Sequence, residues 1–291
     1  MSARQPVILC ELSRDTKDLI DDYVEALKAK APSIGRRRHG MNKNEFWRSG
    51  LFRAAIEQLR GTQAATIHEK RKFVENVLGF LKKQSKITDW KFSGSGERHD
   101  YEVHIGNRIC VIEAKGCLDG NNTNIFQRPA NADEFIIWSL CQNPGSDPRH
   151  NAWSGIHTRL SAEIIHRKER VDGLIIWDML CGTKGRVCPK LTEKPGRATK
   201  IDGIQVPPPC LYLFPRTIPD ARNNRQPECW KIDEVRFLKI LYDAFRCDVQ
   251  DVVEIGIEVQ MSGPNVERKT IWKRDGIIVA ESKWTEIKRA R

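Results

Sequence analysis

A tight turn between two strand-like runs constrains this chain more than any other feature of its sequence. Residues 100–105 (DYEVHI) and 108–115 (RICVIEAK) are separated by Gly106-Asn107. A two-residue Gly/Asn link between such runs is typical of an antiparallel β-hairpin. If both are loop residues, Ile105 pairs with Arg108, the numbers of paired residues sum to 213, and the register of the whole hairpin is fixed.

That register brings two acidic residues together at the open end of the hairpin. Asp100 lies directly opposite Glu113, and opposed residues have Cβ atoms about 4.5–5.5 Å apart on one face of a sheet. Because side chains alternate between faces, Lys115 shares the face of Glu113. Two carboxylates this close repel each other unless a cation lies between them, and Mg²⁺ prefers oxygen ligands. The sequence therefore predicts a metal-binding carboxylate pair suited to hydrolysing a phosphate ester; a surface salt-bridge cluster at a sheet edge is the structural alternative.

The tripeptide Asp/Glu-x-Lys is not specific by itself, because six copies occur in this chain. They start at Asp15, Asp89, Glu113, Glu267, Glu281 and Glu286. The Glu281 copy also lies in an apolar run, but a turn at Asp275-Gly276 would place Thr270 opposite it. Only Glu113 combines an apolar strand with an opposing acid, so we expect the site there.

The remaining hydrophobic patterns predict a mixed α/β or α+β fold. Apolar residues at helical spacing predict helices at residues 14–31, 44–60, 66–83, 131–142, 156–170 and 233–245. Strand-like runs lie within residues 85–98, 171–178, 207–215, 252–263 and 267–284. We expect a central mixed sheet flanked by helices, with a basic helical region at 1–63 followed by a core at 64–291, or a single domain over 1–291.

The acids and the lysine form the pattern Asp100-x12-Glu113-Ala114-Lys115, with a helix predicted before it and a helix–strand unit after it. This pattern resembles the PD-(D/E)xK nuclease superfamily, especially type II restriction endonucleases. The resemblance covers residues 64–215. It implies a restriction-endonuclease-like fold. It also implies that Asp100, Glu113 and the carbonyl of Ala114 bind Mg²⁺ and that Lys115 assists the attacking water.

Two further residues belong to this resemblance. His99 stands where the family motif nominally has proline. Helices of the family often add an acid to the site, and Glu75 is the candidate here, although a solvated helix-surface role suits it equally. The implied activity is cleavage of double-stranded DNA at a short sequence by a cytoplasmic homodimer, in a bacterial or archaeal cell whose separate DNA methyltransferase protects the host.

The charge of the chain favours a polyanionic partner. Lys and Arg number 49 against 38 Asp and Glu, a net charge of +11, with basic clusters at residues 28–43, 182–200 and 283–291. Phosphate contacts are expected from the first two clusters and base contacts from the Asn-rich segment after Lys115. The candidates are Arg36, Arg37, Arg38, Lys43, Asn121, Asn122, Asn124, Gln127, Arg128, Lys184 and Arg186.

The sequence disfavours a membrane protein and a secreted protein, and it leaves two alternative functions open. No apolar run approaches the roughly 18 residues of a membrane helix, and the first residues do not match a signal peptide. Nine cysteines therefore suggest reduced thiols, and a zinc site at Cys181, Cys188, Cys210 and Cys229 is the alternative. The alternatives to a restriction enzyme are a nuclease of the same superfamily without strict sequence specificity, and a non-catalytic DNA-binding protein.

Overall fold

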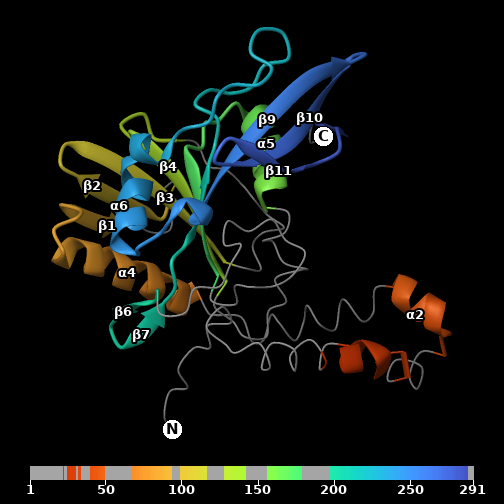
Figure 1. The fold of residues 1–291 in the computed structure, drawn as a ribbon, viewed down its shortest axis with the longest axis horizontal. Coiled ribbons are helices and arrows are strands. Elements are labelled where there is room, and N and C mark those ends of the chain that lie inside the picture. Colours follow the sequence, from red (N-terminus) through yellow and green to blue (C-terminus); the bar gives the residue numbers. More distant parts are fainter. Residues whose placement is uncertain are drawn as a thin grey trace.

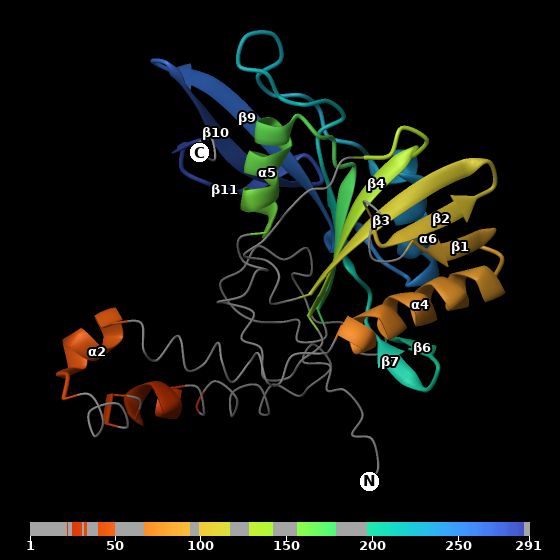
Figure 2. The ribbon, with the colours of Figure 1, turned by 180° about the vertical axis from the view of Figure 1, so that it is seen from behind.

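A large mixed β-sheet organises the part of the chain that the computed structural model describes: residues 22, 25–30, 32–33, 40–49, 67–93, 99–116, 128–141, 156–178 and 197–287. Ten strands form this sheet, and helices lie on both of its faces (Figure 1 and Figure 2). These ten strands are β1 (Asp89–Phe92), β2 (Tyr101–Ile105), β3 (Arg108–Gly116), β4 (Glu134–Cys141), β5 (Gly173–Asp178), β8 (Cys210–Leu213), β9 (Val252–Ser262), β10 (Asn265–Arg274), β11 (Ile277–Glu281) and β12 (Thr285–Glu286). Two further strands, β6 (Thr199–Ile201) and β7 (Ile204–Val206), pair only with each other. The helices are α2 (Lys43–Ser49), α4 (Ile67–Lys83), α5 (Ile156–Arg167) and α6 (Arg236–Ala244), with short 3₁₀ turns η4 (Ile232–Glu234) and η5 (Val249–Asp251).

The order of strands across the sheet is β1-β2-β3-β4-β5-β8-β9-β10-β11, with β12 beside β10. Strands β1, β2 and β3 form an antiparallel meander, whereas β3, β4 and β5 run parallel to one another. Strand β8 is antiparallel to β5 and parallel to β9, and β9, β10 and β11 are again antiparallel. The predicted mixed sheet with flanking helices is thus present.

Two hydrophobic cores lie on opposite faces of the sheet. Helices α4 and α6 cover one face, where Leu78 and Phe237 pack with Ile112 and Trp138. Helix α5 covers the other face, where Leu160 packs with residues such as Ile137. Strand β3 therefore contributes alternate residues to the two cores, as expected for a strand buried on both faces.

The hairpin predicted at Gly106-Asn107 is confirmed. Ile105 pairs with Arg108 and Tyr101 with Ile112, so the paired numbers sum to 213 as expected. Gly106 adopts a φ of +62°, which glycine accommodates without the steric cost of a Cβ atom. The helix expected at 66–83 is also confirmed, since α4 spans Ile67–Lys83.

The helix predicted at 131–142 is wrong, because this segment forms β4. Ile136 and Trp138 belong to the core under α4 and α6, whereas Phe135 and Ile137 belong to the core under α5. A strand buried on both faces is apolar at every position, and its pattern resembles that of a buried helix. The partner strands on each side of β4, rather than its own residues, determine its conformation.

The structure also differs from the predicted pattern at two hairpins. Sequence patterns did not predict the small β6–β7 hairpin, whose Ile201 and Val206 join the core under α4. In the C-terminal hairpin Glu281 pairs with Ile271 instead of Thr270, since a β-bulge shifts the register after Trp272. Helix α2 lies apart from the sheet (Figure 1), and most of the helices predicted at 14–31 and 44–60 fall outside the described residues.

Candidate functional site

The open end of the β2–β3 hairpin carries the two acids that the sequence singled out. Regular pairing ends at Tyr101 and Ile112. One residue earlier, the Asp100 N–H also donates to the Ile112 carbonyl, at 3.0 Å, so that Asp100 and Tyr101 both face Ile112. This is a β-bulge, and bulges commonly redirect a side chain at the end of a ladder. Asp100 therefore does not continue the regular register that would set it directly opposite Glu113.

The bulge brings the Asp100 carboxylate to the backbone of β3. The Ala114 N–H donates to Asp100 Oδ2 at 2.8 Å, in the place where a carbonyl of β2 would accept in a regular ladder. Ala114 is the residue between Glu113 and Lys115, so the carboxylate lies at the centre of the Glu-x-Lys tripeptide. The structure thus joins Asp100 to this tripeptide through a side-chain contact that no strand pattern predicts.

Glu113 is buried within β3, at 6% exposure. Alternation along the strand turns it toward the α5 side with Val111, because Ile112 belongs to the core on the other side. Lys115 pairs with Ser139 of β4 through its backbone. The side chain of Lys115 lies outside the described part of the structure.

Glu75 occupies the other side of the sheet. It is half-buried on α4, whose Arg71 carbonyl accepts a hydrogen bond from the Tyr101 hydroxyl at 3.5 Å. Burial, followed by the negative charges of Glu75 and Asp100, raises the pKa of Tyr101 well above its usual value. Glu75 and Asp100 therefore both act on Tyr101, but the structure does not place Glu75 on the α5 side with Glu113.

Glu102 is a further acid near the site that sequence reasoning missed. It lies two residues beyond Asp100 along β2 and is almost fully buried. Its carboxylate contacts Lys91 Nζ at 3.1 Å and His104 Nε2 at 2.9 Å. The sequence could have indicated Glu102, because it follows Asp100 at the two-residue spacing of one strand face. Its two basic neighbours show that it forms a salt bridge across the strands.

The carboxyl ends of three parallel strands define the edge next to Glu113. Strands β3, β4 and β5 end at Gly116, Cys141 and Asp178, and because they are parallel and adjacent they end at the same edge of the sheet. Ligands of open α/β sheets typically bind outside this edge. The predicted DNA-contacting segments follow two of these strands directly in the chain: the Asn-rich segment follows β3 and the basic segment around Lys184 follows β5.

Most of the predicted DNA contacts cannot be placed relative to this edge. The residues that lie outside the described part of the chain are Arg36, Arg37, Arg38, Asn121, Asn122, Asn124, Gln127, Lys184 and Arg186. Lys43 is described, as the exposed first residue of α2. For the zinc hypothesis, Cys181 and Cys188 are likewise outside, while Cys210 is buried in β8 and Cys229 is partly buried.

The prediction that Arg128 reads DNA bases does not fit the position of its side chain. Its side chain is only 14% exposed, and Nη1 donates to Asp172 Oδ2 at 2.8 Å. Its Nε and Nη2 donate to the Ala132 carbonyl at 3.0 and 2.8 Å, and Nη2 also donates to the carbonyl of Asp133. The guanidinium is thus committed to the interior, where it compensates a buried carboxylate.

The donor set at the hairpin fits a hard cation. Asp100, Glu113 and the Ala114 carbonyl offer oxygen atoms only, which suits Mg²⁺, an ion that keeps several of its waters. Among the described residues no cluster of three or more His, Cys, Asp or Glu side chains forms a metal site. A two-carboxylate site completed by a carbonyl and water is compatible with that finding.

Known proteins give no independent indication of identity. Comparison with protein-family models, curated proteins and solved structures found no match. No helix among the described residues is long and apolar enough to span a membrane. The function must therefore be argued from the geometry of the site itself.

Proposed function

We propose that this protein is a Mg²⁺-dependent endonuclease of the PD-(D/E)xK type that cleaves double-stranded DNA at a short sequence, like a type II restriction enzyme. The observation that carries the proposal is the hydrogen bond from the Ala114 N–H to the Asp100 carboxylate. It ties the first acid of the motif to the backbone between Glu113 and Lys115, so that one hairpin end holds the whole motif.

The order of elements supports the same reading. Helix α4 precedes the antiparallel meander β1-β2-β3, and β4 and β5 then extend the sheet in parallel to β3. Asp100 lies immediately before β2, and Glu113 and Lys115 lie near the end of β3, beside the edge where the parallel strands end. A substrate approaching that edge comes close to Asp100, which is partly exposed, whereas Glu113 is buried within β3.

In the proposed mechanism, Asp100, Glu113 and the Ala114 carbonyl would hold Mg²⁺. A bound ion would supply Lewis-acid activation of a phosphoryl oxygen and of a water molecule. The Ala114 N–H fixes one oxygen of Asp100, which orients the carboxylate before substrate arrives. The Lys115 ammonium stabilises negative charge that develops on the attacked phosphate. Glu75 acts on Tyr101 and takes no part as a ligand in this scheme.

Charge supports DNA as the substrate. The excess of 11 positive charges favours a polyanion, and basic or amide-rich segments directly follow β3 and β5. The remaining parts of the proposal follow from the resemblance alone: a homodimer on a symmetric site, a separate protective methyltransferase and a cytoplasmic location.

The test is digestion of unmethylated plasmid DNA with Mg²⁺ or with EDTA. Wild-type protein is expected to give discrete fragments with Mg²⁺ and intact DNA with EDTA. Asp100→Ala and Lys115→Ala should each reduce cleavage by at least about 100-fold, because each removes a group required in the transition state. Asp89→Ala is the matched control, since it disrupts another Asp-x-Lys tripeptide whose acid instead bonds Lys82 at 2.7 Å.

The outcomes separate the alternatives. Loss of cutting in Asp100→Ala and Lys115→Ala but not in Asp89→Ala supports the proposal, provided that all variants show wild-type circular dichroism. A smear instead of bands indicates a nuclease without sequence specificity. Retention of DNA without cutting, unchanged in Lys115→Ala, identifies a non-catalytic DNA-binding protein and overturns the proposal.

A further inference from the structure

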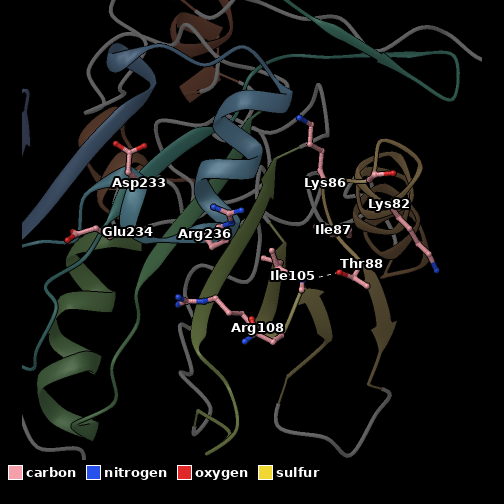
Figure 3. A pocket seen from close by; sticks show the side chains of 12 residues that line it. Lys82, Lys86, Ile87, Thr88, Ile105, Arg108, Asp233, Glu234 and Arg236 are labelled. Carbon is pink, nitrogen blue, oxygen red and sulfur yellow. Dashed lines mark hydrogen bonds between the residues drawn. The ribbon is translucent and has the colours of Figure 1, made fainter.

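A groove with a volume of about 830 Å³ lies at the other end of the hairpin, beside the Gly106-Asn107 turn. Three segments line it: the C-terminal end of α4 with the turn that follows, the β2–β3 turn, and the start of α6 with η4 (Figure 3). Its volume falls within the range of small-molecule sites. Glu113 lies five residue steps along β3 from Arg108 at this end, or about 17 Å of strand, so the groove is distinct from the candidate nuclease site.

Three basic side chains give the groove a positive lining. Lys86 approaches from the α4 side, whereas Arg108 and Arg236 lie on the α6 side with Ile105 between the two sides (Figure 3). In the described part of the chain, no acidic group lies within ion-pair distance of Lys86 or of the Arg236 guanidinium. Arg108 has only a long contact, 3.5 Å, to Glu134. Two cations of the lining are therefore uncompensated.

Two of the other charged residues of the lining, Lys82 and Glu234, are paired outside it, and Asp233 has only a distant basic neighbour. Lys82 bonds Asp89 at 2.7 Å, and its ammonium points away from the groove (Figure 3). Glu234 accepts from Arg216 Nη2 at 2.8 Å and from the backbone of Lys231. Asp233, the remaining acid, lies 4.0 Å from Lys239 Nζ. The acids thus do little to neutralise Lys86 and Arg236.

The walls of the groove are preformed and partly apolar. Ile87 is buried in the core at 3% exposure and Ile105 packs against the same core. The Gly106 N–H donates to Thr88 Oγ1 at 2.9 Å, which ties the β2–β3 turn to the segment after α4. The first N–H groups of α6 are not available to a ligand, because Glu134 accepts them. Binding must therefore use side chains.

We propose that this groove binds a phosphorylated ligand whose phosphates contact Lys86, Arg236 and Arg108 while a flat ring rests on the partly exposed side chain of Ile105. Exposed Lys and Arg side chains around a small apolar surface match the chemistry of a nucleotide. A free nucleotide and the end of a nucleic-acid strand share this chemistry. The inference does not depend on the proposed nuclease activity, because it uses none of the residues at the Asp100 end.

The experiment is isothermal titration of the wild-type protein with ATP, with inorganic pyrophosphate and with a 12-base-pair DNA duplex. The test variant is Lys86→Ala/Arg236→Ala, and both side chains are exposed, so the fold should persist. The control is Lys83→Ala/Arg222→Ala, which removes the same two charges from exposed positions that do not line the groove. Thermal melting checks that both variants are folded.

We expect wild-type protein to bind ATP, and the test variant to bind it at least about tenfold more weakly, while the control stays within about twofold of wild type. Unchanged duplex binding in the test variant identifies a free nucleotide as the ligand, and a matched loss of duplex binding identifies a nucleic-acid end. Absence of ATP and pyrophosphate binding by wild-type protein overturns the proposal. Equal weakening in the test and control variants also overturns it, since only net charge would then matter.

Discussion

At the scale of single residues, Asp172 shows how a strongly basic chain uses some of its arginines internally. The side chain is 3% exposed and accepts from Arg128 at 2.8 Å, from the Phe135 N–H at 2.8 Å and from Trp230 Nε1 at 3.1 Å. Arg170 Nε lies 3.0 Å from it as well. Burial raises the pKa of Asp172, and the charge of Arg128 acts in the opposite direction. Part of the net positive charge is thus structural and cannot contact a partner.

Removing this carboxylate should destabilise the fold strongly. Asp172→Ala is expected to lower the free energy of unfolding by about 3–5 kcal/mol, because it leaves the guanidinium of Arg128 buried without a counter-charge. Urea unfolding followed by tryptophan fluorescence measures the loss. Asp220→Ala is the control, since that acid is exposed and accepts only from turn amides. Equal losses in the two variants would contradict a structural role for the buried ion pair.

His157 is the second residue whose burial has a measurable consequence. It lies at 1% exposure between the rings of Tyr212 and Trp272, and burial lowers its pKa to about 3. The unfolded chain binds a proton at this histidine below about pH 6.5, but the folded protein does not until about pH 3. The contribution of His157 to stability is therefore fully present above pH 6.5 and is lost as the pH falls from 6.5 toward 3.

We expect the unfolding free energy to depend less steeply on pH when residue 157 cannot bind a proton. His157→Phe keeps a ring at the position, so the decline of the unfolding free energy between pH 7 and pH 5 should be smaller than in wild type by about 1 kcal/mol per pH unit or slightly more. Chemical denaturation at several pH values gives the slopes. His166→Phe, at an exposed position of α5, is the matched control for the substitution itself. Identical slopes for wild type and His157→Phe would refute the prediction.

At the scale of elements, α6 depends on a residue from a distant strand. The residue before the helix, Val235, provides no side-chain cap. Glu134 of β4 supplies it instead, by accepting from the N–H groups of Arg236 at 2.6 Å and Phe237 at 2.9 Å. A carboxylate at a helix N-terminus also interacts favourably with the helix dipole. The contact fixes α6 on the sheet, where its Phe237 and Leu241 complete the core.

Glu134→Ala should therefore loosen α6 specifically. Two N–H groups lose their partner, and the expected destabilisation is about 1–3 kcal/mol. Hydrogen exchange should show faster exchange at Arg236 and Phe237 than in wild type. Glu134→Gln keeps one acceptor oxygen and should fall between the two. Unchanged protection of these amides in Glu134→Ala would show that core packing alone holds the helix.

The same scale shows which elements the sequence can predict. The β2–β3 register follows from two turn residues, because a two-residue loop leaves one pairing. The conformation of β4 is not predictable in this way, because a strand buried on both faces has no alternation of apolar and polar residues. Both bulges, at Asp100 and after Trp272, also escape prediction. A bulge adds one residue through backbone geometry that leaves no pattern in side-chain types.

The contacts within the candidate site are not predictable, for a related physical reason. The sequence singles out Asp100 and the Glu113 tripeptide, but regular alternation cannot foresee that Asp100 uses its side chain to bond the Ala114 amide. The buried ion pair between Arg128 and Asp172 is equally unpredictable from the sequence, because the two residues are 44 positions apart in the chain. Contacts between distant segments, rather than local pattern, decide whether a polar residue serves the fold or the surface.

At the scale of the whole molecule, the distribution of charge decides which basic residues are available to DNA. Arg128 and Arg197 are held by buried acids, Asp172 and Asp251. Lys43 is exposed, and the basic segment after β5 follows directly from the edge beside Glu113. Phosphate contacts, if the proposed function holds, are therefore expected from basic residues other than Arg128 and Arg197. The sequence candidates are Lys43, the arginines at 36–38 and the basic segment after β5, and the number of contacts sets how binding responds to salt.

Salt titration tests this number directly. If about six phosphates are neutralised, the slope of log K against log salt is about −5, and affinity falls by about a thousandfold between 50 and 200 mM salt. Fluorescence anisotropy with a labelled duplex and the Lys115→Ala variant measures binding without cleavage. Replacing Arg36, Arg37 and Arg38 with alanine should make the slope shallower by about three, because each lost contact removes about 0.9. Replacing Arg128 should leave the slope unchanged in any protein that still folds, since its guanidinium already neutralises Asp172. A slope near zero, or one that responds to Arg128 but not to the arginine triplet, would show that this assignment of charges to fold and partner is wrong.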